Sequence, residues 1–412
     1  MQELKEWFEA FSKIGQLPDG GYYRGAYTPE ETEQQRLLTL WMKDSGLTVK
    51  RDAAGNLWGT VEGSNPNALP IVTGSHTDSV RSGGNYDGVF GVLGSLMAVK
   101  MLIKEHGKPK IPIQIAAFTG EEGSRFSIGL MGSHAAAGTL DKTTFAGKTD
   151  AAGVTASEAL AAIGLDINKL DEAYHGELGA YLEMHIEQGP VLEEKGLPIG
   201  IVDSIVGTQQ FRVTIHGEAG HAGTVPMANR KDPMVYAARA IERFPEIAKA
   251  TGDGVITVGR IWSMPDAENV IPREVCFTVD LRHPNEEIKQ EMVKAVKAVC
   301  EEEARPSGKP ITWVPFPNNI AIAMDQQLKS MIVDSCNELG YPYITMPSGA
   351  GHDTLNMVKL GKVAMFFIPC EGGRSHCPEE HVKFDDIIKG VELMKKCIYH
   401  LAYEDCLGLG AK

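Results

Sequence analysis

The sequence lacks the features of a membrane or secreted protein. In its 412 residues no stretch approaches the roughly 18 consecutive apolar residues of a membrane-spanning helix. Residues 1–9 are charged and amphipathic and carry no apolar run of the kind that a signal peptide needs. Seven cysteines, an odd number with scattered spacing, do not suit a disulfide framework and indicate reduced thiols. We therefore expect a cytoplasmic protein with no membrane partner.

Basic residues are fewer than acidic residues. The chain has 40 Lys and Arg against 54 Asp and Glu, a formal net charge of −14. This charge opposes binding to phosphate backbones and to anionic lipid surfaces, so we expect no nucleic-acid partner. If the substrate is an anion, a local positive group must attract it against the field of the whole protein. An Arg or a metal ion could be that group.

Composition and periodicity predict a two-domain α/β protein. A hydrophobic content of 43% and a charged content of 23% are typical of globular chains, and the length suggests two or three domains. Short apolar runs alternate with helical patterns, which indicates a doubly wound, mostly parallel sheet. The predicted strands of this sheet are 69–73, 111–119, 181–184 and 363–368, and the predicted helices include 89–103 and 385–403.

A smaller domain is predicted inside the larger one. From about residue 207 apolar and polar residues alternate, as at 211–215 and 275–281, which is typical of half-exposed antiparallel strands. Two helix patterns, 233–249 and 285–305, accompany them. We expect 207–322 to form an inserted α/β sandwich, and 1–206 with 323–412 to form the larger domain. The stretch 140–179 is interpreted as irregular and shows no recognisable chemistry.

The first candidate metal ligands follow the predicted strand 69–73. In SHTDSVRSGGNYDG (75–88), His76 and Asp78 stand two residues apart, so the carboxylate could accept a proton from one imidazole nitrogen while the other nitrogen faces a metal. Asp87 lies in a glycine-rich loop that could turn it back toward His76. By itself this pattern more often belongs to a capped turn with a surface His and Asp.

Two adjacent carboxylates, Glu121 and Glu122, follow the predicted strand 111–119. Side chains of successive residues point in different directions, so one could bind metal while the other reaches a metal-bound water. That division suits hydrolysis. Paired glutamates are more often solvated surface residues, but these two stand at the end of a core strand.

Two further histidines, His185 and His376, each follow an apolar run and precede a Gly or Pro turn. Taken singly, each is more often a residue of the core or surface. Together with His76, Asp87 and Glu122 they supply two imidazoles for one ion, an imidazole and a carboxylate for another, and a shared carboxylate. This set predicts a site for two divalent ions of zinc, manganese, cobalt or nickel.

Seven ordered motifs along the chain resemble one enzyme family. They are SHTDSVRSGGNYDG, AFTGEEGSRF, MHIEQGPVLEEKGLPIGIV, GEAGHAGTVPMANRKDP, ENVIP with VDLRHP, PSGAGHD and GGRSHCPEE. The chain resembles the hydantoinase/carbamoylase branch of the M20 metallohydrolases over essentially its whole length. Within that branch it is most similar to allantoate amidohydrolases and N-carbamoyl-L-amino acid hydrolases.

The resemblance implies a role for each candidate. It places the metal ligands on His76, Asp87, Glu122, His185 and His376, with Asp87 bridging; the general base on Glu121; and the residue that orients His76 on Asp78. A histidine at position 185 favours the ureido-cleaving branch, because the resemblance implies that aminoacylases and peptidases of the wider family usually carry a carboxylate there.

Substrate-binding candidates lie mostly in the predicted insertion. Strand periodicity puts Arg282 beside Asp280, on the face opposite the apolar residues, and a guanidinium can hold a carboxylate through two hydrogen bonds. The alternative is a surface ion pair with Asp280. The resemblance implies that His221, Asn269 and Arg282 lie over the substrate and that in a homodimer they come from the partner subunit. Secondary candidates are Gln188, Gln209, Gly351 and His352; His352 could equally belong to a structural turn.

These residues lead us to expect a hydrolase that cleaves the C–N bond of a small anionic ureido acid. We expect allantoate as the substrate, with N-carbamoyl-L-amino acids as the alternative. An aminoacylase or peptidase of the same family is a more distant possibility, and a noncatalytic metal-binding scaffold is another. The complete ligand set together with Glu121 argues against the scaffold.

Overall fold

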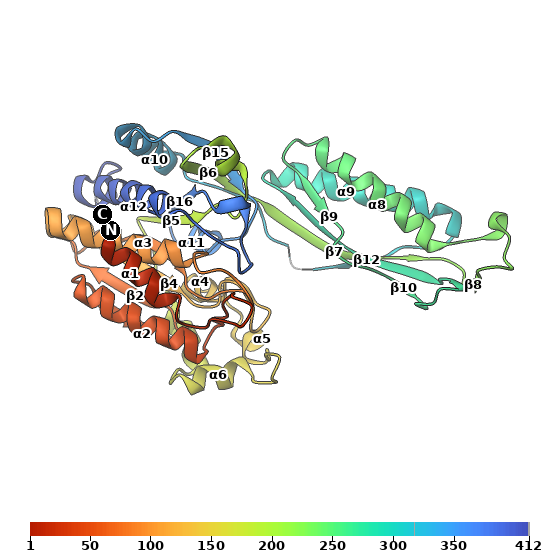
Figure 1. Ribbon diagram of the computed structural model, residues 1–412, viewed down its shortest axis with the longest axis horizontal. Coiled ribbons are helices and arrows are strands. Elements are labelled where there is room, and N and C mark those ends of the chain that lie inside the picture. The colour runs from red at the N-terminus through yellow and green to blue at the C-terminus, as the bar shows by residue number, and fades with distance from the viewer. Residues whose placement is uncertain (317, 411–412) are drawn as a thin grey trace. The chain divides into compact units, whose positions relative to one another are not determined.

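A computed structural model describes residues 1–316 and 318–410 (Figure 1). The chain divides into two compact units. The first comprises Met1–Asp203, Met324–Met346 and Gly351–Lys412, and the second comprises Ser204–Ala323 and Pro347–Ala350. The expected α/β fold with a larger and a smaller unit is confirmed. The predicted insertion, 207–322, lies within the second unit but omits its return segment Pro347–Ala350.

A mixed sheet of nine strands, counted over the described residues, forms the centre of the first unit, although its short strand 322–323 is assigned to the second unit. Its order is β1-β2-β4-β3-β5-β16-β6-β14, with β15 also paired to β6. The strands are β1 (Thr48–Arg51), β2 (Leu57–Val61), β3 (Ile71–His76), β4 (Ile113–Phe118), β5 (Ala180–Ile186), β6 (Ile199–Ile205), β14 (Ile322–Ala323), β15 (Tyr343–Ser348) and β16 (Lys362–Ile368). Neighbours among β4, β3, β5 and β16 pair in parallel, so their carboxyl ends meet at one edge.

Helices cover this sheet. They are α1 (Gln2–Phe11), α2 (Pro29–Asp44), α3 (Val89–His106), α4 (Met131–Ala136), α5 (Lys142–Ala146), α6 (Ala156–Ala162), α7 (Val191–Lys195), α10 (Gln326–Leu339), α11 (Thr354–Met357) and α12 (Phe384–Ile398). Every residue of β3 and of β5 is buried, as expected for parallel strands covered on both faces. Such strands read as continuous apolar runs, which is why the sequence revealed them.

The second unit is a five-stranded antiparallel sheet with two long helices (Figure 1). Its elements are β7 (Gly207–His216), β8 (Gly220–His221), α8 (Pro233–Lys249), β9 (Val255–Thr257), β10 (Ile261–Met264), β11 (Val270–Ile271), β12 (Glu274–His283), α9 (Glu286–Ala304) and β13 (Thr312–Pro315). On β12 the odd-numbered residues 275–281 pack in the core with α8 and α9, so the even-numbered residues from 278 lie on the open face. β8 and β11 form a separate two-stranded ladder.

Three details differ from or extend the sequence interpretation. The stretch 140–179 is not irregular: it contains α5, α6 and a 3₁₀ segment, Ile167–Ala173, packed around a small core that includes Phe145 and Leu160. Helices of five to seven residues are too short to show periodicity. All seven cysteines are free thiols. Among the described residues, no helix is both long enough and apolar enough to cross a membrane.

A buried carboxyl group, that of Glu31, ties α2 to the end of β4. Its two oxygens accept hydrogen bonds from the backbone N–H of Tyr27 at 2.6 Å and from the hydroxyl of Thr119. Thr119 stands two residues before Glu121 in the chain. Burial raises the pKa of Glu31 to about 7, although the hydrogen bond from Thr119 opposes the rise.

This pKa predicts a pH-dependent stability that Glu31→Gln should remove. Because the folded pKa is raised, the contribution of Glu31 to stability is fully present below the unfolded pKa of about 4.5 and is lost as the pH rises through about 7. The free energy of unfolding of the wild type should fall relative to the variant by about 3 kcal/mol across that window. Urea unfolding at a series of pH values measures the difference. Glu30→Gln, on the same helix, is the control and should retain the wild-type profile; parallel profiles for wild type and Glu31→Gln would contradict the prediction.

Candidate metal centre

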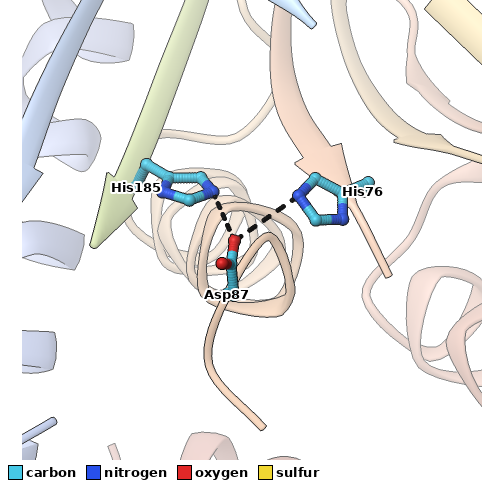
Figure 2. Close-up of side chains that lie close together, drawn as sticks. All are labelled: His76, Asp87 and His185. Atoms are coloured by element: carbon cyan, nitrogen blue, oxygen red, sulfur yellow. Dashed lines mark ion pairs between the residues drawn. The ribbon is translucent and has the colours of Figure 1, made fainter. Parts of the chain in front are cut away.

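The carboxyl ends of β3 and β5 place two histidines on either side of one carboxylate (Figure 2). His76 is the last residue of β3, and His185 lies near the end of β5. Asp87 comes from the glycine-rich loop before α3, and its Oδ1 lies 3.6 Å from Nε2 of His76 and 3.0 Å from Nε2 of His185. All three residues are buried. One donor atom from each lies within 4.8 Å of the others, so the group can hold a metal ion.

The other oxygen of Asp87 belongs to a second such group. Its Oδ2 lies 3.1 Å from Nε2 of His376, which in turn lies 3.4 Å from Oε2 of Glu122. The His376 side chain is 48% exposed, whereas Asp87 and Glu122 side chains are about 6–7% exposed. The five predicted ligands therefore form two candidate groups that share Asp87, and the second group opens toward solvent.

Glu121 stands beside the first group and Asp78 supports both. Oε2 of Glu121 lies 3.8 Å from Nε2 of His76. The carboxylate of Asp78 accepts the backbone N–H of Glu121 at 3.0 Å and that of Glu122 at 3.2 Å. Nδ1 of His76 lies 3.2 Å from the Asp78 carbonyl oxygen and 3.5 Å from its carboxylate. Asp78 thus contacts His76, as expected, and also fixes the loop that carries both glutamates.

Close packing fixes the loop of Asp87. Gly88 has φ +64°, and a Cβ on it would lie 2.4 Å from the imidazole of His76. Only glycine fits this position, because any side chain would displace the ring. The N–H of Gly88 also donates to Nε2 of His185 at 3.2 Å. The backbone of this loop therefore contacts both imidazoles of the first group.

The protonation of the cluster reflects its crowded acids and imidazoles. Burial raises the pKa of Glu121 well above its usual range, and burial together with the charge of Asp87 raises the pKa of Glu122 to about 7. For Asp87, burial acts in the same direction, but the three imidazoles around it hold its pKa well below its usual range. The hydrogen bond to Asp87 raises the pKa of His376 to about 9. Protons here occupy positions that cations would take, and metal binding would release them.

Sequence reasoning missed two residues that hold Asp87. Oε1 of Glu380, a buried residue, accepts the backbone N–H groups of Tyr86 at 2.8 Å and of Asp87 at 3.0 Å. The hydroxyl of Ser375 lies 2.8 Å from Oδ2 of Asp87 and 2.8 Å from Oε2 of Glu380. Both residues belong to the motif around His376, so their position in GGRSHCPEE was a signal. They join the loop of His376 to the loop of Asp87.

Arg24 supports the same loop from the N-terminal segment. It is fully buried, and its guanidinium donates to the side-chain oxygen of Asn85 at 2.8 Å and to the carbonyl of Gly84 at 3.1 Å. Burial lowers the pKa of Arg24 to about 10, while nearby carboxylates, including that of Glu380, oppose the shift. Its side chain therefore binds the segment that leads into Asp87.

The secondary candidates of the first unit lie at different points around the candidate metal centre. Nε2 of Gln188 donates to Oδ2 of Asp87 at 2.7 Å, which places Gln188 at the shared carboxylate. The ring of His352 is buried and packs edge to face on that of His185, with centroids 4.6 Å apart. Burial and the neighbouring His185 lower the pKa of His352, so its imidazole is neutral. Gly351 is exposed beside it.

The substrate-binding candidates of the second unit lie in two separate parts of that unit. His221 pairs with Val270 in the β8–β11 ladder, and the N–H of Ala222 donates to the carbonyl of Asn269 at 3.1 Å, so His221 and Asn269 lie together and exposed. Arg282 stands at the opposite end of β12 from the segment that follows β11. Residues 274 and 282 of an extended strand are about 26 Å apart. One chain therefore does not bring Arg282 together with His221.

Arg282 makes the ion pair that the sequence left open as an alternative. Its Nε and Nη2 donate to the two oxygens of Asp280 at 2.9 and 3.0 Å, and its Nη1 donates to the carbonyl of Gly349 at 2.8 Å. Gln209 lies directly across from Leu281, whose side chain is in the core. Opposed residues share a face, so Gln209 lies on the helix-covered face and not with Arg282.

Comparisons with known proteins identify the family of the chain. Residues 72–400 match the family described as Peptidase family M20/M25/M40. The N-carbamoyl-L-amino acid amidohydrolase of Geobacillus stearothermophilus is 39% identical over 95% of this chain and 96% of that protein. The allantoate amidohydrolase of Escherichia coli (strain K12) is 33% identical over 98% of each. The crystal structure of an amidase of the hydantoinase/carbamoylase family from Burkholderia multivorans has a TM-score of 0.90 and 32% identity, covering 96% of each chain.

The matches extend over nearly the whole chain and include its candidate metal centre. The similar solved structure belongs to the hydantoinase/carbamoylase family of amidases. The chain therefore belongs to peptidase family M20/M25/M40, in its hydantoinase/carbamoylase branch, and is a hydrolase that acts on C–N bonds other than peptide bonds.

Proposed function

We propose that this protein is a metal-dependent amidohydrolase that cleaves a C–N bond in the carbamoyl group of an N-carbamoyl acid. The products would be the amino compound, ammonia and carbon dioxide. The observation that carries the proposal is one buried carboxylate, Asp87, shared by two groups of metal-binding side chains beside a second carboxylate, Glu121. The names of the relatives support the carbamoyl class of substrate.

The residues present fit two divalent ions. His76, His185 and Asp87 would hold one, and Asp87, Glu122 and His376 the other. Imidazole and carboxylate donors suit zinc, manganese, cobalt or nickel. The carbonyl oxygen of Gln188 supports the fit, because this buried atom beside Asp87 has no hydrogen-bond partner among the described residues. When bound, such ions polarise a carbonyl oxygen and lower the pKa of water.

Glu121 would transfer the proton. Its carboxylate takes a proton from the water that attacks the carbamoyl carbon and then gives it to the departing nitrogen. Burial in the cluster raises the pKa of Glu121, and a raised pKa suits a group that must hold the proton between the two steps. Asp78 positions this carboxylate through the backbone N–H of Glu121. His221 would donate a hydrogen bond to the oxyanion that forms, and Arg282 would bind the carboxylate of the substrate.

Two substrates within this class are supported. The sequence motifs favoured allantoate, which carries a second ureido group where a carbamoyl amino acid carries its side chain. The 39% identity with the Geobacillus protein favours an N-carbamoyl-L-amino acid, and relatives named for allantoate are 33 to 35% identical. A pocket with hydrogen-bonding groups would favour allantoate, and an apolar pocket the alternative.

We propose in addition that the active unit is a homodimer. The length of β12 alone puts Arg282 about 26 Å from residue 274, at the end of the strand nearer the ladder of His221, and a molecule the size of allantoate cannot span that distance. If both contact one substrate, the second must come from another copy of the chain.

The substrate class is tested with purified protein loaded with Zn²⁺ or Mn²⁺. We expect turnover of allantoate or N-carbamoyl-L-methionine, with kcat/KM at least about a hundredfold above that for N-acetyl-L-methionine or a dipeptide, because the site would discriminate by contacts to the ureido group. Ureidoglycolate and N-carbamoyl-β-alanine complete the panel. Faster hydrolysis of the N-acetyl acid or the dipeptide would replace the proposal with an aminoacylase or a peptidase.

The role of Glu121 is tested by Glu121→Gln. An amide cannot take the proton, so kcat should fall at least about a hundredfold. Metal content, measured by elemental analysis, should stay at the wild-type level because Glu121 is not among the proposed ligands. Glu9→Gln, on the exposed surface of α1, is the control and should leave both quantities unchanged. Activity of Glu121→Gln equal to that of the wild type would refute the assignment.

The shared site is tested by mixing two inactive variants. When Glu121→Gln and His221→Ala are co-expressed, half of the dimers should be mixed, and one of the two sites in each mixed dimer would then have both residues intact. About a quarter of the wild-type activity should return. If both residues acted from the same chain, the mixture would be as inactive as its components.

A further inference from the structure

The open face of the sheet in the second unit carries a groove of about 690 Å³. Its floor includes Thr278, Asp280 and Arg282 of β12 with Gln210 of the neighbouring β7. Arg260, in the turn between β9 and β10, also lines it. Every residue of the groove belongs to the second unit, so the groove can be described from that unit alone.

Inside the groove, the negative charge of Asp280 balances the positive charge of Arg282. Asp280 accepts two hydrogen bonds from Arg282 and a third, at 2.7 Å, from Gln210. The hydrogen bonds from Arg282 help to lower the pKa of Asp280 against the effect of burial, so Asp280 is ionised. Of the five N–H groups of a guanidinium, Arg282 uses three here, which leaves one on each of Nη1 and Nη2. Arg282 therefore still offers a fork of two donors but brings no net charge.

Arg260 is the unmatched charge of the groove. Among the residues that the structure describes, no carboxylate pairs with its guanidinium, which lies 5.7 Å from the centroid of the Trp262 ring. Its carbonyl accepts the N–H of Thr278 at 3.0 Å, which fixes residue 260 next to β12. Counting Arg260, Arg282 and Asp280, the groove has a net charge of +1 in a chain whose formal charge is −14. This is a local positive group of the kind that an anionic substrate requires.

We propose that Arg260 supplies the charge, and Arg282 the two-donor fork, that bind a single carboxylate in this groove. The inference rests on the proposed function, since it takes that carboxylate to belong to the N-carbamoyl acid. A net charge of +1 balances one carboxylate and leaves a second one unbalanced. The groove therefore selects monoanionic ureido acids, such as allantoate or carbamoyl amino acids with neutral side chains, over dianions such as N-carbamoyl-L-aspartate.

Steady-state kinetics of Arg260→Gln test this assignment. With whichever of allantoate and N-carbamoyl-L-alanine the wild type turns over, KM should rise about tenfold and kcat should change less than about twofold, because the lost charge acts on binding. Arg260→Lys keeps the charge and should recover most of the affinity. Arg239→Gln removes the same charge from the exposed surface of α8 and should behave as wild type. An unchanged KM in Arg260→Gln would identify Arg260 as a solvated surface residue and overturn the proposal.

The selection of charge is measured on the wild type. N-carbamoyl-L-aspartate should show kcat/KM at least about tenfold below that of N-carbamoyl-L-asparagine, its neutral counterpart of nearly equal size. Equal values would remove the claim that the groove prefers monoanions.

A binding measurement separates this proposal from the proposed function. Because Trp262 lies against Arg260, a carboxylate in the groove should change the fluorescence of Trp262. Metal-loaded protein is titrated with propionate and with propionamide at constant ionic strength. Propionate alone should give the change, and Trp262→Phe and Arg260→Gln should abolish it. If no ureido acid is hydrolysed but this response appears, the proposed function fails and the groove stands; if propionate gives no response, the groove proposal fails.

Discussion

The site depends on holding one carboxylate, Asp87, between three imidazoles. Its Oδ1 faces the first group and its Oδ2 the second, so any rotation of the side chain would break one of them. The surrounding structure prevents that rotation from several directions. Gln188 and Ser375 donate to Oδ2, Glu380 accepts the backbone N–H, and Arg24 holds the segment before it. The ligands come from separate loops, and Asp87 is the point at which these loops are joined.

That arrangement explains how so many acids can be buried together. Asp78 and Glu380 are buried carboxylates, and each accepts two backbone N–H groups that belong to loops of the site. A buried carboxylate with such donors costs less than a bare one, because the hydrogen bonds replace part of its hydration. The side chains of Glu121 and Glu122 accept no backbone N–H among the described residues, and burial raises the pKa of both. Divalent ions would supply the missing positive charge, which is the physical reason to expect two of them.

Sequence reasoning found the residues that stand at strand ends and missed those that act through the backbone. His76, His185 and Glu122 follow apolar runs, and parallel strands bring such positions to one edge, so their meeting was predictable. Glu380 stands in the motif around His376 but was not assigned a role, because its partners are main-chain N–H groups and its residue type alone does not indicate such contacts. Helices α5 and α6 were missed for a different reason, since they are too short for periodicity. The capping box of Thr155 and Glu158 at α6 was a signal that was not used.

Strand geometry decides what the second unit can contribute from a single chain. The ladder of β8 and β11 sets His221 next to Asn269, so those two residues can act on the same atoms. β12 then runs the full length of the sheet before it reaches Arg282, and an extended strand cannot shorten. Two hydrogen bonds to Asp280 also hold the Arg282 side chain on the open face of the sheet. The length of that side chain therefore does not bring its guanidinium to His221. Sequence reasoning named His221, Asn269 and Arg282 as candidates. It did not predict that Arg282 lies apart from the other two, because that separation follows from the length of β12. His221 and Arg282 of one chain therefore cannot both contact the same small molecule.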